Sequence, residues 1–229
     1  MASFEERLGY EFNNKALLDM ALSHSSYVNE CKKSGVQSNE RLEFLGDSVL
    51  SLITAEYLYK QYVQYPEGVL TKTRASVVCE KSLAVFAREI DLGTSIKCGK
   101  GELGQHGNFR DSILSDAYEA VMAAVYLDGG FDAVKKVYEA RIIKAVDEAI
   151  VHCSNDDYKT RLQEIVQKNR SVTLAYEIIG ESGPDHDKRF EAQVLLDSNP
   201  IARGVGHSKK DAEQHAAKAA LTLMGESNV

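Results

Sequence analysis

Residues 4 to about 150 show the hydrophobic periodicity of helices. Apolar side chains recur at steps of three and four residues, as they do where one face of a helix packs on a core. Four segments share this pattern: 42–53, 83–90, 113–127 and 134–150. Glycine and proline interrupt it between the segments, at Pro66, within 99–107 and at Gly129. The pattern predicts an all-helical domain over residues 1–152.

The pattern changes after residue 152. A short polar linker is expected at 153–157, followed by a helix over 158–168. Three runs rich in β-branched and aromatic residues come next, at 171–180, 189–197 and 201–207. A final helix begins with Ser208 as its N-cap and ends at Met224. The chain is therefore predicted to be multidomain, with an all-α domain followed by an α+β domain of αβββα order over residues 158–226.

The composition is that of a globular protein, with 44% hydrophobic and 27% charged residues among 229. No run approaches the roughly 18 apolar residues that span a bilayer, and the amino terminus lacks a secretory signal. We therefore expect a cytoplasmic protein with no membrane partner. The four cysteines are far apart and form no CxxC pair, so we expect reduced thiols rather than zinc ligands or disulfides.

The net charge of −7 by itself argues against a nucleic-acid partner. A case for such a partner must therefore come from the local placement of charge.

Three acids share one face of the helix predicted around residues 40–60. Glu40, Glu43 and Asp47 fall within about 60° of one another at 100° per residue. A solvated face is the usual explanation for such a stripe. Here Phe44 and Leu50 flank the acids and apolar residues fill the opposite side, so we expect the helix to be buried nearly all round. Unpaired carboxylates are costly in such a place.

A second helix repeats the feature. Asp116 and Glu119 are the only charged residues in 113–127, and Arg41 and Arg110 are too few to neutralise five carboxylates. Acids gathered in a poorly solvated place need a cation or must take up protons. An all-oxygen ligand set favours Mg²⁺, with Mn²⁺ as a substitute. Paired protonated carboxylates and a hidden arginine network stay open as alternatives.

These residues carry a family resemblance. The segment NERLEFLGDSVL (39–50) resembles the signature of the ribonuclease III family, whose members are endonucleases that cut double-stranded RNA. DAYEAVMAAVYLD (116–128) is similar to the second acidic helix of that family, and PEGVLTKTRASVV (66–78) to its intervening segment. The resemblance implies Mg²⁺-dependent phosphodiester hydrolysis that leaves 5′-phosphate and 3′-hydroxyl ends with short 3′ overhangs. It also implies a role in rRNA and mRNA processing and turnover.

The resemblance assigns roles to the acids. Glu43, Asp47, Asp116 and Glu119 match metal ligands, with Asp47 and Glu119 the most directly catalytic. Two further acids, Glu40 and Glu67, match positions at the edge of the catalytic valley. The loop 104–111 has fewer arginines than is common in the family. No side-chain nucleophile is needed, and we expect His24 to start a helix or pack rather than to act as a base.

The last helix carries Lys209 and Lys210 in its first turn, where cations oppose the helix dipole. Free amides, dipole and ammonium groups together bind phosphate, although a solvated surface pair is the usual alternative. The pattern KTRLQE…GPDHDKRF…GHSKKDAEQHAAKAAL resembles the double-stranded RNA-binding domain that accompanies ribonuclease III. By that resemblance Gln163 and Glu164 face one minor groove, His186 reaches the next, and the two lysines contact the phosphates between them.

Cutting both strands with one acidic cluster per chain requires two copies, so we expect a homodimer, with Phe44 and its apolar neighbours as the surface. Two other functions compete with this interpretation. One is a catalytically silent RNA-binding protein on the same scaffold, and the other is a helical scaffold whose acids bind a basic protein. The acids at all matching positions disfavour the silent protein, because a pure binder would gain by losing carboxylates near RNA phosphates.

Overall fold

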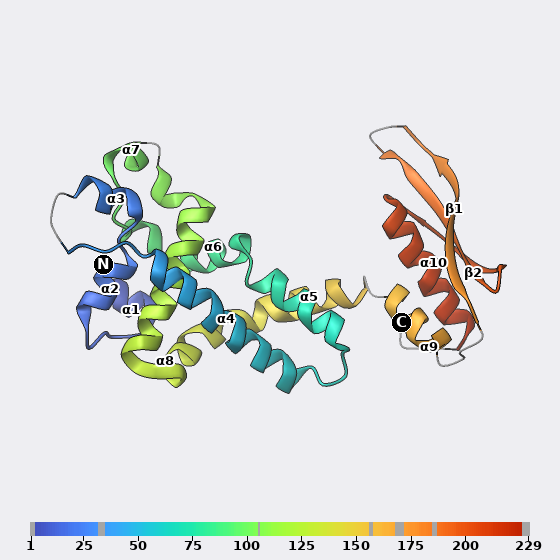
Figure 1. Ribbon diagram of the computed structural model, residues 1–229, viewed down its shortest axis with the longest axis horizontal. Helices are drawn as coiled ribbons and strands as arrows, with labels where there is room; N and C mark the ends of the chain where they lie inside the picture. Colours follow the sequence, from blue (N-terminus) through green and yellow to red (C-terminus); the bar gives the residue numbers. More distant parts are fainter. Residues whose placement is uncertain are drawn as a thin grey trace. The chain divides into compact units, whose positions relative to one another are not determined.

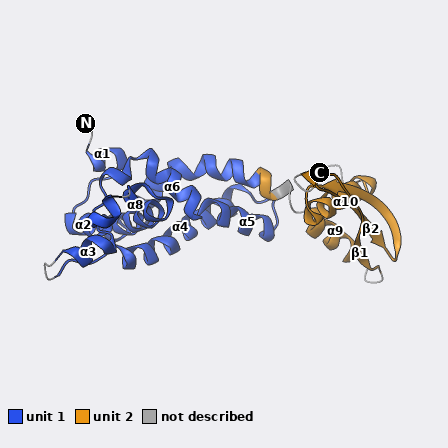
Figure 2. Ribbon diagram, turned by 90° about the horizontal axis from the view of Figure 1, so that it is seen from above, with its two compact units in different colours: residues 1–150 blue, residues 151–229 orange. Residues whose placement is uncertain are grey.

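The computed structural model describes residues 3–31, 35–104, 106–155, 158–167, 172–184 and 187–225. The chain forms two compact units, residues 1–150 and 151–229 (Figure 2). The first unit is helical, and the second contains a three-stranded antiparallel sheet with two helices. This is the predicted fold class. No helix in the described ranges is long and apolar enough to cross a membrane.

The helical unit contains eight α-helices within its described residues. These are α1 (Phe4–Leu8), α2 (Lys15–Ala21), α3 (Ser25–Glu30), α4 (Glu40–Gln61), α5 (Glu67–Val77), α6 (Glu80–Glu89), α7 (Lys100–Leu103) and α8 (Asp111–Asn155). Two 3₁₀ turns, η1 (Leu92–Thr94) and η2 (Gly107–Phe109), connect α6, α7 and α8. Gly130 has non-helical backbone angles and divides α8 into two helical stretches. Because α8 continues to Asn155, the first three residues of the expected linker are helical.

The first stretch of α8 forms the centre of the core. Its residues 120–125 have no exposed surface, and Leu50 and Ile53 of α4 are fully buried as well. The sequence AVMAAV mixes small alanines with the larger side chains of valine and methionine. Small side chains let neighbouring helices approach, while the larger ones fill the space between them. The acids that precede this stretch are therefore held on a rigid helix.

Helix α4 is not buried nearly all round, and that expectation was wrong. Phe44 is 79% exposed, Leu52 58% and Tyr59 76%, while Leu50 and Ile53 on the inner side have no exposed surface. Apolar residues occur around the whole circumference of α4, yet only one side meets the other helices of its own unit. Periodicity alone could not distinguish the two sides.

The second unit contains α9 (Tyr158–Gln167), β1 (Leu174–Ser182), β2 (Arg189–Leu196), β3 (Asn199–Gly206) and α10 (Lys209–Leu223). The strands pair in the order β1-β2-β3, and both helices lie on the same face of the sheet (Figure 1). Leu162 of α9, Val194 of β2 and Ala216 of α10 are completely buried in the core between these layers. The αβββα order predicted from periodicity is confirmed.

The turn between β2 and β3 lies earlier than expected. The sequence SNP indicated a turn at 198–200, but the hairpin turns at Asp197 and Ser198, whose φ angles are 48° and 66°. Two left-handed residues form the two-residue turn that matches the twist of a hairpin. Pro200 instead belongs to β3, where it pairs with Leu195 of β2. A proline is tolerated there because β3 is an edge strand.

Strand β3 lies directly against the backbone of α10. A Cβ atom at Gly204 would lie 2.1 Å from the backbone nitrogen of Ala216. Ser208 caps the helix by accepting a hydrogen bond from the Asp211 amide at 3.1 Å, as its sequence position predicted. The close approach and the cap together fix where the first turn of α10 lies relative to the sheet.

Candidate metal centre and nucleic-acid interface

Helices α4 and α8 touch backbone to backbone where their acids meet. A Cβ atom at Gly46 would lie 2.0 Å from the carbonyl oxygen of Glu119, a distance that no side chain can occupy. Gly46 lies one turn after Glu43 and directly before Asp47. The absence of a side chain at position 46 therefore brings the acids of α4 next to those of α8.

Three of the predicted ligands gather at this contact. Glu43, Asp116 and Glu119 each offer one carboxylate oxygen, and these oxygens all lie within 4.8 Å of one another. The three side chains are partly buried. The spacing is short enough for one cation to contact all three.

Burial is the largest cause of a raised pKa at all three carboxyl groups, and repulsion by nearby acids adds to it. The pKa of Glu119 rises to about 8, first because of burial and then because of the charges on Asp47, Glu43 and Asp116. The pKa of Glu43 rises for the same reasons, with Asp116 and Glu40 as the neighbouring charges. No positive charge acts on Glu43 or Glu119 among the described residues. Without a bound cation, the site stabilises protons on its carboxyl groups.

The other predicted acids lie outside this group of three. Asp47 is exposed, but it is near enough to be the strongest of the charges that raise the pKa of Glu119. Glu40 is exposed and accepts a hydrogen bond from the Ser38 hydroxyl at 3.0 Å. Glu67 begins α5 and accepts one from the Thr71 hydroxyl at 2.7 Å.

A hidden arginine network does not neutralise the three carboxylates within the described part of the chain. Arg110 forms an ion pair with Glu102 at 3.2 Å. An oxygen-only set of carboxylates lies close together, and only negative charges act on Glu43 and Glu119 among the described residues. Such a set fits a hard divalent ion such as Mg²⁺.

The sequence did not predict two neighbours of Asp116, Glu80 and His24. Glu80, the first residue of α6, raises the pKa of Asp116, whereas His24 lowers it; burial is the largest influence. The predicted role of His24 at a helix start is confirmed, because its ring accepts a hydrogen bond from the Ser26 amide as the N-cap of α3. Both residues are far from Asp116 in sequence, so no local spacing could have indicated their proximity.

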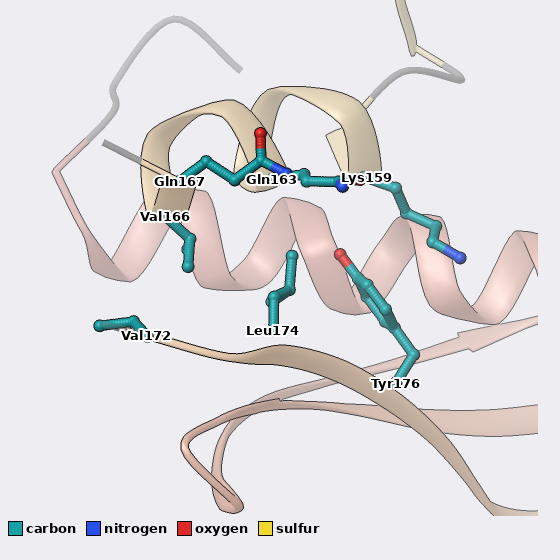
Figure 3. A pocket seen from close by; sticks show the side chains of 7 residues that line it. All are labelled: Lys159, Gln163, Val166, Gln167, Val172, Leu174 and Tyr176. Atoms are coloured by element: carbon teal, nitrogen blue, oxygen red, sulfur yellow. The ribbon is translucent and has the colours of Figure 1, made fainter. Parts of the chain in front are cut away.

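The predicted RNA contacts of α9 lie at its surface. Gln163 and Glu164 are both exposed. Gln163 also lines a pocket of about 300 Å³ between α9 and β1, where the Tyr176 hydroxyl points toward α9 (Figure 3). That hydroxyl has no hydrogen-bond partner among the described residues, and the Lys159 ammonium lies 4.4 Å from the centre of the Tyr176 ring. His186 lies outside the described residues.

The predicted phosphate contacts occupy the first turn of α10. Lys209 and Lys210 are its first two residues, and both are exposed. The Ser208 cap uses the amide of Asp211, and Asp211 in turn accepts a hydrogen bond from the His207 amide at 2.8 Å. The first two amides of the helix are not used by this cap. These amides belong to Lys209 and Lys210 themselves, so they and the two lysines occupy the same turn of α10, a combination that suits an anion.

Two family models match the chain. A ribonuclease-III-like model covers residues 14–146, and a double-stranded RNA binding motif covers residues 158–224. Ribonuclease 3 of Caldanaerobacter subterraneus is 51% identical over 221 residues, which cover 96% of each chain. Ribonuclease 3 of Listeria innocua is 45% identical over 220 residues, again with 96% of each chain covered.

Solved structures agree with this assignment. The nuclease domain of ribonuclease III from Campylobacter jejuni aligns with a TM-score of 0.55 and 41% identity, over 63% of this chain and 92% of that one. A second structure of that domain, reported for structural flexibility in a region involved in dimer formation, aligns with the same TM-score and identity. The helical unit, its acidic pair of helices and the following αβββα unit define a nuclease joined to an RNA-binding module. The chain belongs to the ribonuclease III family of endoribonucleases.

Proposed function

We propose that this protein hydrolyses phosphodiester bonds of double-stranded RNA with the help of Mg²⁺, for which Mn²⁺ can substitute. The observation that carries the proposal is the group formed by Glu43, Asp116 and Glu119, whose carboxylate oxygens lie within 4.8 Å of one another. The match of residues 158–224 to a double-stranded RNA binding motif supplies the substrate class. The products are expected to carry 5′ phosphates and 3′ hydroxyls, with short 3′ overhangs.

The three partly buried carboxylates would hold the cation, with Asp47 at the exposed side of the group. When bound, a divalent ion supplies charge neutralisation at phosphate oxygens and lowers the pKa of water that attacks phosphorus. The protein contributes by holding the carboxylate oxygens in fixed positions. Rigid helices α4 and α8 hold the oxygens in place, and the backbone contact at Gly46 sets the distance between the two helices. Asp47 and Glu119 are assigned the most direct catalytic roles.

RNA affinity is assigned mainly to the second unit. Gln163 and Glu164 on α9 would face one minor groove, while Lys209 and Lys210 on α10 would contact phosphates. His186 is proposed to reach a second minor groove. This division separates chemistry from binding, because the acids of the first unit repel the RNA backbone until a cation is present. Recognition of shape and phosphates rather than base edges predicts weak dependence on sequence.

We further propose a homodimer in which the exposed side of α4 is the contact surface. Phe44 is 79% exposed and Leu52 58%, which is unusual for large apolar side chains on one helix of a folded unit. A second copy related by a twofold axis would also supply the second acidic group needed to cut the opposite strand. Measurement of mass in solution tests the stoichiometry, and Phe44→Ser should shift the protein toward monomer. A wild-type protein that is monomeric at micromolar concentration would contradict the dimer.

A labelled RNA duplex incubated with the protein and Mg²⁺ tests the proposed activity. We expect short duplex products, no cleavage after addition of EDTA, and no cleavage of single-stranded RNA of the same sequence. Binding without cleavage in Mg²⁺ would instead favour a silent RNA-binding protein. Absence of both would favour a scaffold for a basic protein partner. The RNAs that we expect it to process in the cytoplasm are structured rRNA and mRNA precursors, which should accumulate when the protein is depleted.

A further inference from the structure

A carboxylate lies between two lysines at the end of the sheet nearest the start of α10. Glu181 lies near the end of β1, directly opposite Phe190 of β2. Its Oε2 atom is 2.7 Å from the ammonium of Lys188, and its Oε1 atom is 4.0 Å from that of Lys209. Each lysine therefore approaches a different oxygen of the same carboxylate.

The two lysines also share one aromatic ring. The ammonium of Lys188 lies 5.7 Å from the centre of the Phe190 ring, and that of Lys209 lies 5.9 Å from it. Phe190 is partly buried and packs against the core of the second unit, so it gives both lysines a fixed support. The cation–π contacts restrain the long side chains near each other. Lys188, at the end of the loop before β2, thereby joins the first turn of α10 in space.

The geometry of this group resembles that of a bound phosphate. A carboxylate with two oxygens between two ammonium groups occupies the kind of place that a phosphate with its anionic oxygens takes at a cluster of lysines. All three charged side chains remain 42–63% exposed, so a phosphate of RNA can reach the lysines and Glu181 can turn into solvent. Exposed ion pairs are weak, so exchanging the carboxylate for a phosphate costs little free energy.

We infer that Lys188 is a third phosphate-binding lysine of this unit and that Glu181 competes with RNA phosphate for Lys188 and Lys209. The inference rests on the proposed binding of double-stranded RNA. Binding requires both lysines to exchange the carboxylate for phosphate and leaves Glu181 as a negative charge beside the RNA backbone. Glu181 therefore lowers the affinity for every duplex alike, and its removal should raise that affinity.

The test compares two variants that lose the same charge from the same strand. Glu181→Gln removes the competitor. Glu177→Gln removes an exposed acid whose carboxylate accepts a hydrogen bond from the side-chain amide of Gln193 at 2.9 Å. Affinity of the full-length protein for a labelled duplex is measured by fluorescence anisotropy in EDTA over a series of salt concentrations. We expect Glu181→Gln to bind about 2- to 5-fold more tightly than Glu177→Gln at 0.1 M salt. Its slope of log affinity against log salt should be steeper by about 0.7–0.9.

A third variant tests the role of Lys188. Added to Glu181→Gln, the substitution Lys188→Gln should abolish most of the gain in affinity and return the slope toward that of the wild type. Equal affinities for Glu181→Gln and Glu177→Gln would overturn the competition. A gain that persists undiminished in the double variant would overturn the assignment of Lys188. If the wild-type protein does not bind the duplex at all, the proposed function fails instead, so the two failures are distinguishable.

Discussion

At the scale of single residues, Glu119 combines the strongest effects in the acidic group. It is partly buried, its pKa rises to about 8, and three neighbouring carboxylates contribute to that rise after burial itself. A group in this position gives up a proton when a cation binds, so metal affinity and proton affinity oppose each other there. Two predictions follow from this competition, one for catalysis and one for stability.

Glu119→Gln should separate cleavage from RNA binding. The amide preserves size while it removes a charged oxygen ligand, so we expect the cleavage rate in saturating Mg²⁺ to fall by a factor on the order of 10² or more. Duplex affinity in EDTA should change little, because the substitution lies far from the lysines of α10 in sequence and belongs to the other unit. Glu148→Gln, at a highly exposed position of α8, is the control and should cleave normally. Near wild-type turnover in Glu119→Gln would remove this residue from the proposed metal centre.

The second prediction concerns stability without metal. Because the folded protein holds the Glu119 proton more tightly than the unfolded chain does, unfolding releases a proton between the ordinary pKa of 4.5 and the raised value of about 8. The protonated Glu119 therefore contributes to the free energy of unfolding below that window, and this contribution is lost as pH rises through it. In EDTA, the melting temperature of Glu119→Gln relative to wild type should increase with pH across this window. A difference that stays constant with pH would contradict the raised pKa, and Mg²⁺ should stabilise the wild type more than the variant.

At the scale of elements, the contact between α4 and α8 determines whether the acids meet. Gly46→Ala would place a Cβ atom 2.0 Å from the carbonyl oxygen of Glu119, so the two helices must move apart. We expect the free energy of unfolding to fall by about 1–3 kcal/mol. We expect Mn²⁺ affinity, measured by electron paramagnetic resonance, to fall in the variant that remains folded.

Gly68→Ala provides the matched control for this substitution. Position 68 is also helical, but its Cβ atom would meet nothing within 4 Å. Alanine should be neutral or slightly stabilising there, because it reduces the freedom of the unfolded chain. Equal effects of the two substitutions on stability and Mn²⁺ affinity would show that the contact between Gly46 and Glu119 leaves room for a side chain.

Local sequence signals predicted the elements better than their contacts. The Ser208 cap, the His24 cap and the β-branched runs depend on neighbours in sequence, and each element formed near its predicted place. The hairpin turn was misplaced because a proline, usually a turn signal, fits an edge strand equally well. The acidic face of α4 could be predicted from spacing, although which side of α4 is buried could not.

Contacts between distant segments were not predictable in this way. Glu80 approaches Asp116 from another helix, and Lys188 approaches Glu181 across a hairpin. The need for glycine at position 46 depends on a carbonyl oxygen that lies 73 residues further along the chain. Each of these contacts is decided by how the elements pack, and a single sequence contains no local signal for it.

At the scale of the whole molecule, the two compact units suggest separate tasks. A protein that ends at Ser154 keeps all the proposed metal ligands and loses α9, the sheet and α10. We expect it to fold and to cut duplex RNA at low salt. Its activity should fall more steeply with salt than that of the full chain, since it lacks the phosphate contacts that supply affinity.

Salt series with the full-length protein and with Lys209→Ala/Lys210→Ala provide the comparison for the shortened protein. The double substitution should weaken binding to all duplexes alike and flatten the slope of log affinity against log salt by about 0.7–0.9 for each lost contact. An unchanged slope would mean that these two lysines are merely solvated. Normal salt tolerance of the shortened protein would place the main RNA contacts in the first unit.

Sequence divergence in this protein is severely constrained at Gly46, a position that carries no chemistry. Every replacement of Gly46 adds at least a Cβ atom, and the atom in its way belongs to the main chain of Glu119. A compensating change of side chain at position 119 cannot relieve that clash. Natural drift and laboratory evolution can alter an exposed position of α4 such as Lys60 in small steps. No single substitution at position 46 avoids the clash, so variants selected for a new activity must keep this glycine.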